Sequence, residues 1–256
     1  MAREQILNVK DLTVSFDGFK ALDLESFQMF EKELRVIIGP NGAGKTTFLD
    51  VLCGKTRPDE GCVSFLGHDL RSLKEDEIVD AGIGRKFQTP SIFSSLTVFE
   101  NLMLSRKTDR SVFKTLFYRL SQLDREAITT AAERAGLADF LEVRAGALSH
   151  GQKQWLEISM VILQDPKLFL VDEPAAGMTD EETERTGELL KELSLERAII
   201  VIEHDMTFVR QLKSVVTVFH EGKMLVEGPM EDVQQDPRVI ECYLGSAVPL
   251  SKRCVV

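Results

Sequence analysis

The segment that most constrains this 256-residue chain is Gly39-Pro40-Asn41-Gly42-Ala43-Gly44-Lys45-Thr46. It fits the pattern G-x-x-x-x-G-K-[ST], in which a strand leads through a glycine-rich turn into a helix. The flanks agree, because residues 34–38 are a largely apolar run typical of a buried strand and residues 45–53 are predicted to be helical. Glycines let the backbone wrap closely around phosphate oxygens, and the helix N-terminus adds partial positive charge. The segment therefore predicts a nucleotide-binding phosphate loop.

The side chains of this loop have separate expected roles. Lys45 is expected to reach the β- and γ-phosphates of ATP, and the Thr46 hydroxyl is expected to ligate Mg²⁺. The residues predicted to contact the nucleotide here are Gly39, Pro40, Asn41, Gly42, Ala43, Gly44, Lys45, Thr46 and Thr47.

Two acids close another apolar run, which reads Leu-Phe-Leu-Val-Asp-Glu over residues 168–173. A strand buried on both faces of a parallel sheet has this pattern, with functional groups at its carboxyl end. Asp172 is predicted to hold Mg²⁺ directly or through water. Glu173 is predicted to orient and polarise the attacking water.

Strand patterns alternate with helix patterns on both sides of a helical middle. Strands are predicted at residues 6–16, 34–38, 62–66, 168–172 and 198–203, with a hairpin of 215–220 and 223–227. Helices are predicted at residues 45–53 and 179–193, and a short one follows Pro229. From Thr97 to about Leu163 the pattern is helical, and Thr97 with Glu100 has the spacing of a capping box. The order predicts an α/β core with an inserted helical subdomain.

Composition limits the class of protein. Lys and Arg number 31 against 41 Asp and Glu, which gives a formal net charge of −10. A protein with this balance lacks the basic surface that broad nucleic-acid binding requires, so no nucleic-acid partner is expected. The longest apolar runs have the length of strands, whereas a transmembrane helix needs about 20 residues. Four cysteines without a C-x-x-C pair are typical of reduced thiols, so a cytosolic location is expected.

The segment Leu148-Ser149-His150-Gly151-Gln152 resembles the L-S-G-G-Q signature of ATP-binding cassette (ABC) ATPases, with His150 at the position of the first glycine. It lies between the phosphate loop and the acidic strand, in the order that the family shows. The other marks of the family follow the same order. They are Phe16 near an expected strand end, Gln88 after the phosphate loop, and His204 after the strand that follows Asp172.

This resemblance covers residues from about Ile6 to Gly245 and implies an α/β P-loop NTPase core with an antiparallel β subdomain and an inserted α-helical subdomain. The expected division is one ABC ATPase domain over residues 1–245, followed by a tail at 246–256. Residues 1–85 and 165–245 form the expected catalytic core with its β subdomain. Residues from about 90 to 163 form the expected helical subdomain.

The resemblance also implies roles for single residues. Gln88 would ligate or sense Mg²⁺, His204 would contact the γ-phosphate, and Phe16 would stack on adenine. In this family two cassettes enclose two ATP molecules head to tail. Ser149, Gly151 and Gln152 would therefore contact the ATP that is bound to the partner cassette.

Within the family, the chain looks most like the branch that serves branched-chain amino acid and urea importers. Residues 85–90, 148–157 and 236–241 favour the urea type, so import of urea or short amides is the first expectation. Import of branched-chain amino acids, or a lipopolysaccharide-type exporter, stays open as an alternative. A non-transport ABC protein is a remote one. Lys32 departs from the family, which has glycine there.

The expected partners follow from the resemblance. They are a second ABC ATPase subunit in a homo- or heterodimer, two integral membrane permease subunits, and a periplasmic or extracellular solute-binding protein. The expected location is the cytoplasmic face of the bacterial inner membrane, where the chain would be a peripheral subunit. Residues 89–93, after Gln88, are expected to meet the membrane subunit.

Overall fold

The computed structural model describes residues 4–86, 91–106 and 121–245. Gln88, the first two residues of the segment 89–93 and the predicted tail at 246–256 lie outside the described residues. The strands are β1 Gln5–Phe16, β2 Phe19–Phe30, β3 Leu34–Ile38, β4 Glu60–Phe65, β5 His68–Asp69, β6 Ile83–Lys86, β7 Leu168–Asp172, β8 Ala198–Ile202, β9 Val215–His220 and β10 Lys223–Pro229. The helices are α1 Lys45–Leu52, α2 Glu75–Ala81, α3 Val98–Ser105, α5 Gln122–Arg134, α6 His150–Ile162, α7 Asp180–Ser194, α8 Met206–Leu212, α9 Met230–Val233 and α10 Pro237–Gly245.

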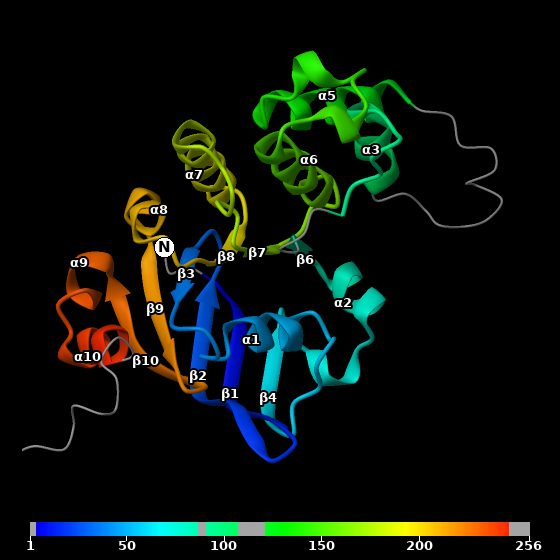
Figure 1. The fold of residues 1–256 in the computed structure, drawn as a ribbon. Coiled ribbons are helices and arrows are strands. Elements are labelled where there is room, and N and C mark those ends of the chain that lie inside the picture. Colours follow the sequence, from blue (N-terminus) through cyan, green and yellow to red (C-terminus); the bar gives the residue numbers. More distant parts are fainter. Residues whose placement is uncertain (1–3, 87–90, 107–120, 246–256) are drawn as a thin grey trace, which may run out of the picture.

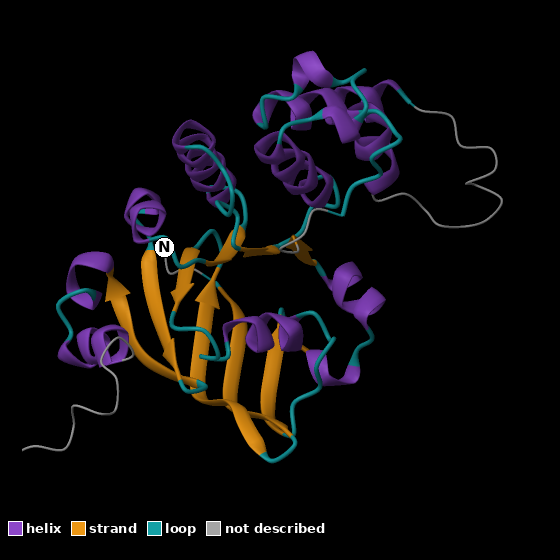
Figure 2. Ribbon diagram, in the orientation of Figure 1, coloured by secondary structure: helices purple, strands orange, loops and turns teal. Residues whose placement is uncertain are grey.

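Two sheets organise the core (Figures 1 and 2). The larger one has six strands in the order β10-β9-β3-β8-β7-β6, all parallel to their neighbours except β10, which is antiparallel to β9. The smaller one is antiparallel and has the order β2-β1-β4-β5. The predicted fold class, an α/β core with an antiparallel β subdomain, is confirmed.

The two faces of the six-stranded sheet bury different sets of helices. In β7, Leu168 and Leu170 point into the cluster that contains α1 and the small sheet, whereas Phe169 and Val171 point into the cluster that contains α6, α7 and α8. This alternation is the two-residue period of a strand. It explains why the run 168–171 is apolar throughout, because each side chain is buried on one face or the other. Consequently α1 and α6 lie on opposite faces of the sheet.

A block of three helices, α3, α5 and α6, stands on the second face (Figure 1). The predicted capping box of Thr97 and Glu100 is confirmed at the start of α3, where the Glu100 N–H donates to the Thr97 hydroxyl over 3.1 Å. Polar contacts join this helical block to α7. The Trp155 indole N–H donates to the Thr186 hydroxyl over 2.9 Å. Among the described residues, no helix is both long enough and apolar enough to span a bilayer.

The observed elements agree with the prediction in some places and differ from it in others. The run 34–38 and the run 168–172 are strands with the predicted limits. The strand β2 was not predicted, since the exposed pair Glu25 and Ser26 interrupts its alternation. The C-terminal region contains two helices instead of one. Lys32, where the family has glycine, holds a left-handed backbone with φ of 55°, so the turn before β3 keeps the geometry that favours glycine.

Candidate functional site

The phosphate loop connects β3 to α1 through residues 39–44. Gly39, Gly42 and Gly44 all have positive φ, and Gly44 is the N-cap of α1. At two of these positions the surroundings also require glycine. A Cβ atom on Gly39 would lie 2.2 Å from the Phe219 carbonyl oxygen, and one on Gly44 would lie 2.6 Å from the Ala21 carbonyl oxygen. The loop is therefore held between β9 and β2, and at these two positions its backbone is too close to a neighbouring strand for a side chain.

Lys45 opens α1 and its side chain folds back over this loop. Its Nζ donates to the carbonyl oxygens of Gly39 and Pro40 over 2.7 and 3.0 Å. Burial lowers the pKa of Lys45 below its ordinary value, and the carboxylates of Glu173 and Asp172 act in the opposite direction. The ammonium group thus lies in the field of the predicted catalytic residue Glu173 and of the predicted metal ligand Asp172. Thr46, the next residue, is exposed.

Asp172 is the last residue of β7 and is 5% exposed. Its Oδ2 lies 3.2 Å from Nη2 of Arg85, and Arg85 also forms an ion pair with Asp50 on α1. Burial raises the pKa of Asp172, and the Arg85 guanidinium opposes that rise. The arginine joins the helix of the phosphate loop to the end of β7. No contact of Arg85 was predicted, since a single arginine in a short segment carries no signal of its partners.

Glu173 follows Asp172 in a left-handed conformation, with φ of 45°. This conformation costs a non-glycine residue roughly 1–2 kcal/mol, so the surroundings must impose it. The Glu173 N–H donates to the Ile202 carbonyl over 3.0 Å, which anchors the residue to β8. Its Oε1 lies 3.5 Å from Nδ1 of His204. The structure thus brings together the predicted pair of a water-activating carboxylate and the histidine after β8.

A buried ion pair joins β6 to the helical block. Lys86 is fully buried, and its Nζ lies 3.9 Å from Oε2 of Glu157 on α6, which is also buried. The other oxygen of Glu157 accepts the Ser91 N–H over 3.1 Å. Burial lowers the pKa of Lys86, whereas Glu157 and the nearby acids Asp172, Glu203 and Glu173 raise it. Lys86 therefore provides positive charge inside a group of carboxylates.

We expect Glu157→Ala to lower the free energy of unfolding by about 3 kcal/mol, because it leaves a buried ammonium group without this carboxylate. The double variant Lys86→Met/Glu157→Leu should recover part of that loss, since the ammonium group that lacked its carboxylate is then gone, although Glu203 and Asp172 lose a nearby positive charge. Urea unfolding followed by tryptophan fluorescence measures both values. A loss in the double variant as large as in Glu157→Ala would contradict this account.

The predicted signature segment forms the start of α6. Ser149 is its N-cap, and the Gln152 N–H donates to the Ser149 hydroxyl over 3.1 Å. The Ser149 hydroxyl in turn donates to Oε1 of Glu182 over 3.0 Å. A Cβ atom on Gly151 would lie 2.4 Å from Cδ of Glu182, so this glycine makes room for the carboxylate. His150, at the position of a family glycine, has its Nε2 3.0 Å from the Ala176 carbonyl.

The adenine-stacking prediction falls on the hairpin of β1 and β2. Phe16 is 50% exposed and pairs in register with Phe19, which is 68% exposed. The sequence analysis did not single out Phe19. Both lie on the hairpin whose second strand carries Ala21, the residue in close contact with the phosphate loop. Two exposed aromatic side chains therefore lie near this loop. Gln88 is outside the described residues, and the structure does not place it.

The residues present fit Mg²⁺ bound together with a nucleotide. No cluster of three or more His, Cys, Asp or Glu side chains that would cage a metal occurs among residues 4–86, 91–106 and 121–245. Mg²⁺ in phosphate-loop sites needs no such cage, because a hydroxyl, one carboxylate and the substrate phosphates supply its ligands. An exposed Thr46 at the start of α1 and Asp172 at the end of β7 are this donor set.

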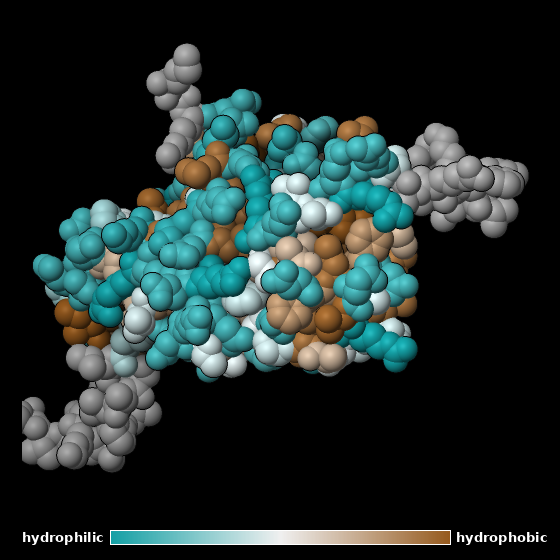
Figure 3. All heavy atoms as spheres, turned by 90° about the horizontal axis from the view of Figure 1, so that it is seen from above, coloured by the Kyte–Doolittle hydropathy of each residue, from teal (hydrophilic) through white to brown (hydrophobic). Residues whose placement is uncertain are grey.

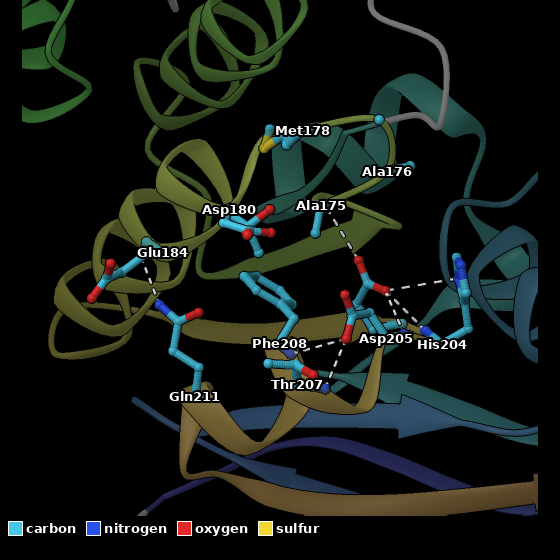
Figure 4. Close-up of a pocket in the computed structure, with 13 residues that line it drawn as sticks. Ala175, Ala176, Met178, Asp180, Glu184, His204, Asp205, Thr207, Phe208 and Gln211 are labelled. Atoms are coloured by element: carbon cyan, nitrogen blue, oxygen red, sulfur yellow. Dashed lines mark hydrogen bonds and ion pairs between the residues drawn. The ribbon is translucent and has the colours of Figure 1, made fainter.

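A pocket of about 600 Å³ lies beside this site, between the loops after β7 and β8 and the helices α7 and α8 (Figure 4). Glu203, His204 and Asp205 line it from the loop after β8, and Ala175 lines it from the loop after β7. None of residues 39–47 lines the pocket, so it is distinct from the surface of the phosphate loop.

Known proteins share this arrangement. The family model for ABC transporters matches residues 22–176, and the model for the branched-chain amino acid ATP-binding cassette transporter matches residues 223–249. The high-affinity branched-chain amino acid transport ATP-binding protein BraF of Pseudomonas aeruginosa is 34% identical over 253 residues, which cover 94% of this chain and 98% of BraF. The corresponding protein LivG of Escherichia coli K12 is 34% identical over 255 residues, which cover 95% of this chain and 99% of LivG.

Solved structures agree with the sequence relatives. A nucleotide-free ATP-binding cassette from an ABC transporter superposes with a TM-score of 0.80 at 31% identity, covering 94% of this chain and 99% of that one. The ADP conformation of MJ1267, an ATP-binding cassette of an ABC transporter, gives a TM-score of 0.82 at the same identity and coverage.

The expected urea type is not supported, because BraF and LivG are named as branched-chain amino acid proteins. The alternative that the sequence left open is the better match. The broader prediction holds, since the resemblance extends over nearly the whole length of both relatives and both solved structures. This chain belongs to the ABC transporter family as an ATP-binding subunit and is an ATPase.

Proposed function

We propose that this chain hydrolyses ATP to drive a bacterial ABC importer for branched-chain amino acids. The observation that carries the proposal is the convergence of Lys45, Asp172, Glu173 and His204 at the carboxyl ends of β3, β7 and β8. In parallel sheets, ligands bind at this edge. The choice of solute rests on the names of the relatives and on the match of the C-terminal segment.

The proposed chemistry assigns one task to each group. Backbone N–H groups of the phosphate loop and the Lys45 ammonium bind the phosphates, while Thr46 and Asp172 hold Mg²⁺. Mg²⁺ neutralises charge on the β- and γ-phosphates when bound. Glu173 orients water toward the γ-phosphate, and His204, within 3.5 Å of that carboxylate, helps to position the water. A metal ion held directly by Asp172 would compete with the contact of that carboxylate with Arg85.

The proposed site needs a second cassette. The N-terminus of α6 is suited to bind a phosphate, because its N–H groups and dipole attract anions. However, α6 packs on the face of the sheet opposite to α1. This arrangement supports a head-to-tail dimer, in which Ser149, Gly151 and Gln152 of one cassette meet the ATP on the phosphate loop of its partner. The division into a core, a helical subdomain at about 90–163 and a tail is part of the same proposal.

The helical block is the proposed contact with two membrane permease subunits. Figure 3 shows hydrophobic side chains gathered over the part of this face that the helical block forms, beside a largely hydrophilic surface. Leu104 and Leu123 of this block are exposed, and so is Phe93 in the loop before α3. Phe93 is the last residue of the segment expected to meet the membrane subunit. The chain would therefore bind at the cytoplasmic face of the inner membrane, together with a solute-binding protein on the other side.

Copurified permease subunits in vesicles provide the test of the solute. We expect ATP hydrolysis to rise when the matching solute-binding protein carries leucine, isoleucine or valine, and to stay at its basal rate with urea or a short amide. Stimulation by urea alone would restore the urea type. Stimulation without any binding protein, coupled to lipopolysaccharide release, would favour an exporter.

Lys45→Ala is expected to weaken ATP binding about tenfold to a hundredfold, because it removes a charge-assisted contact worth roughly 1.5–3 kcal/mol. Titration with a fluorescent ATP analogue measures the dissociation constant. Lys55→Ala, at an exposed position three residues after the end of α1, is the control and should bind as the unaltered chain does. Unchanged affinity in Lys45→Ala would argue against the phosphate-loop assignment.

A further inference from the structure

Glu203 directly follows β8 and stands out because it is a carboxylate with only 1% of its surface exposed. Its Oε1 accepts the Ala175 N–H over 3.1 Å. Its Oε2 accepts the N–H groups of His204 and Asp205 over 2.9 and 3.2 Å. Figure 4 shows these contacts, with Ala175 on one side of the carboxylate and His204 on the other. One side chain therefore joins the loop after β7 to the loop after β8.

The main chain of Glu203 adds a third connection. Its N–H donates to the Ile37 carbonyl over 3.2 Å, which ties the residue to β3 immediately before the phosphate loop. Three elements that carry the proposed catalytic groups thus meet at Glu203. The buried Lys86 lies close enough for Glu203 to raise its pKa, so positive charge inside the protein compensates the buried carboxylate.

The contact with Ala175 bears directly on Glu173. Glu173 holds an unfavourable left-handed backbone, and such a conformation persists only where the surroundings fix the chain on both sides. On one side the Glu173 N–H is bonded to Ile202. On the other side, the N–H two residues later is bonded to the Glu203 carboxylate. Glu203 therefore fixes the direction in which the chain leaves Glu173.

The contact with His204 acts in the same way on the other loop. The His204 side chain is 65% exposed, so little packing holds it. Its Nδ1 lies 3.8 Å from Oε2 of Glu203 and 3.5 Å from Oε1 of Glu173. The hydrogen bond from the His204 N–H to Oε2 of Glu203 fixes the main chain from which the imidazole ring projects.

We infer that Glu203 is a positioning residue for ATP hydrolysis, which aligns Glu173 and His204 by accepting backbone N–H groups from both loops. It is not a catalytic residue, because its oxygens are buried and occupied by backbone donors. The inference rests on the proposed function of Glu173 and His204. It adds a residue that the sequence motif does not indicate.

Glu203→Gln is the test, because glutamine has the same size but only one acceptor oxygen. The NH₂ group of the glutamine must face the backbone N–H donors of one of the two loops, and it cannot accept a hydrogen bond from them. At least one loop therefore loses its hydrogen bond to residue 203. We expect kcat to fall about tenfold to a hundredfold, because small misplacements of catalytic groups slow a reaction by such factors. The affinity for ATP should change less than about twofold. Hydrogen exchange should become faster at the amides of the released loop, which are Ala175 on one side or His204 and Asp205 on the other.

Glu33→Gln is the matched control, since Glu33 is also buried and its carboxylate accepts the Phe30 N–H over 2.9 Å. Glu33 directly precedes β3, whereas the phosphate loop follows the other end of that strand. This variant should lower the melting temperature and leave kcat and hydrogen exchange in both loops unchanged. If Glu203→Gln does not fold, Glu203→Asp gives the same measurements, because the shorter carboxylate cannot reach both loops. A Glu203 variant that behaves like Glu33→Gln overturns the inference.

A double variant separates this inference from the proposed function. In single-turnover experiments, Glu203→Gln should add little to the effect of Glu173→Gln, because both act through the same water. If Glu173→Gln alone hydrolyses ATP at the full rate, the role of Glu173 in the proposed function fails. If Glu173→Gln is inactive but Glu203→Gln keeps full kcat, only the role of Glu203 fails.

Discussion

Glu173→Gln should slow ATP hydrolysis by about two to four orders of magnitude, the usual contribution of a general base. Glutamine keeps the size of the side chain and the backbone conformation, but it cannot take a proton from water. Lys45, Thr46 and Asp172 are untouched, so ATP should bind with its usual affinity. Phosphate release measures the first effect, and titration with a fluorescent ATP analogue measures the second.

The same variant should also trap the ATP-bound dimer. Bound ATP joins the two cassettes in the proposed mechanism, and hydrolysis with phosphate release removes this link. Size-exclusion chromatography in Mg²⁺ and ATP should therefore show a dimer that the unaltered chain forms only transiently. Glu25→Gln, an exposed change on β2, is the control and should have no effect on either measurement. Undiminished hydrolysis in Glu173→Gln would exclude Glu173 as the base.

The parts of the site that the sequence predicted are those in which local chemistry is decisive. Strands β3 and β7 are buried on both faces, so their apolar runs give the correct limits. The turn after β3 needs glycine at Gly39 and Gly44, where φ is positive and backbone carbonyls of neighbouring strands leave no room for a side chain. The strand β6 was not predicted, because Arg85 and Lys86 interrupt its apolar pattern. Both side chains are nevertheless buried, since each pairs with a carboxylate from another element.

The residues that the sequence analysis missed make hydrogen bonds to residues far away in the sequence. Glu203 binds the amide of Ala175, 28 residues away, and Glu182 binds the hydroxyl of Ser149, 33 residues away. A lone acid after an apolar strand is usually solvated, and only the three-dimensional arrangement shows that Glu203 is buried. The acid directly before His204 was the one available signal. Contacts of this kind follow from the sheet order, which places β7 beside β8.

Ser149→Arg should abolish hydrolysis in a dimer of this chain while each subunit still binds ATP. Ser149 is exposed at the N-terminus of α6, on the opposite face of the sheet from α1. An arginine there blocks the surface that would meet the partner's γ-phosphate, but it leaves the phosphate loop of its own chain unchanged. Ser121→Arg is the matched control, because Ser121 caps α5 in the same way, with the Asp124 N–H at 3.1 Å. It should lose only the cap, about 1 kcal/mol of stability.

Mixing two inactive variants makes this prediction decisive. In a heterodimer of Ser149→Arg and Glu173→Gln, one site combines the intact Glu173 of the first chain with the intact Ser149 of the second, and the other site carries both defects. Random pairing of equal amounts leaves about a quarter of all sites intact, since half of the dimers are mixed and each has one good site. Hydrolysis should therefore reappear in the mixture, although neither variant is active alone. If each chain instead used its own signature helix, every site would keep one defect and the mixture would stay inactive.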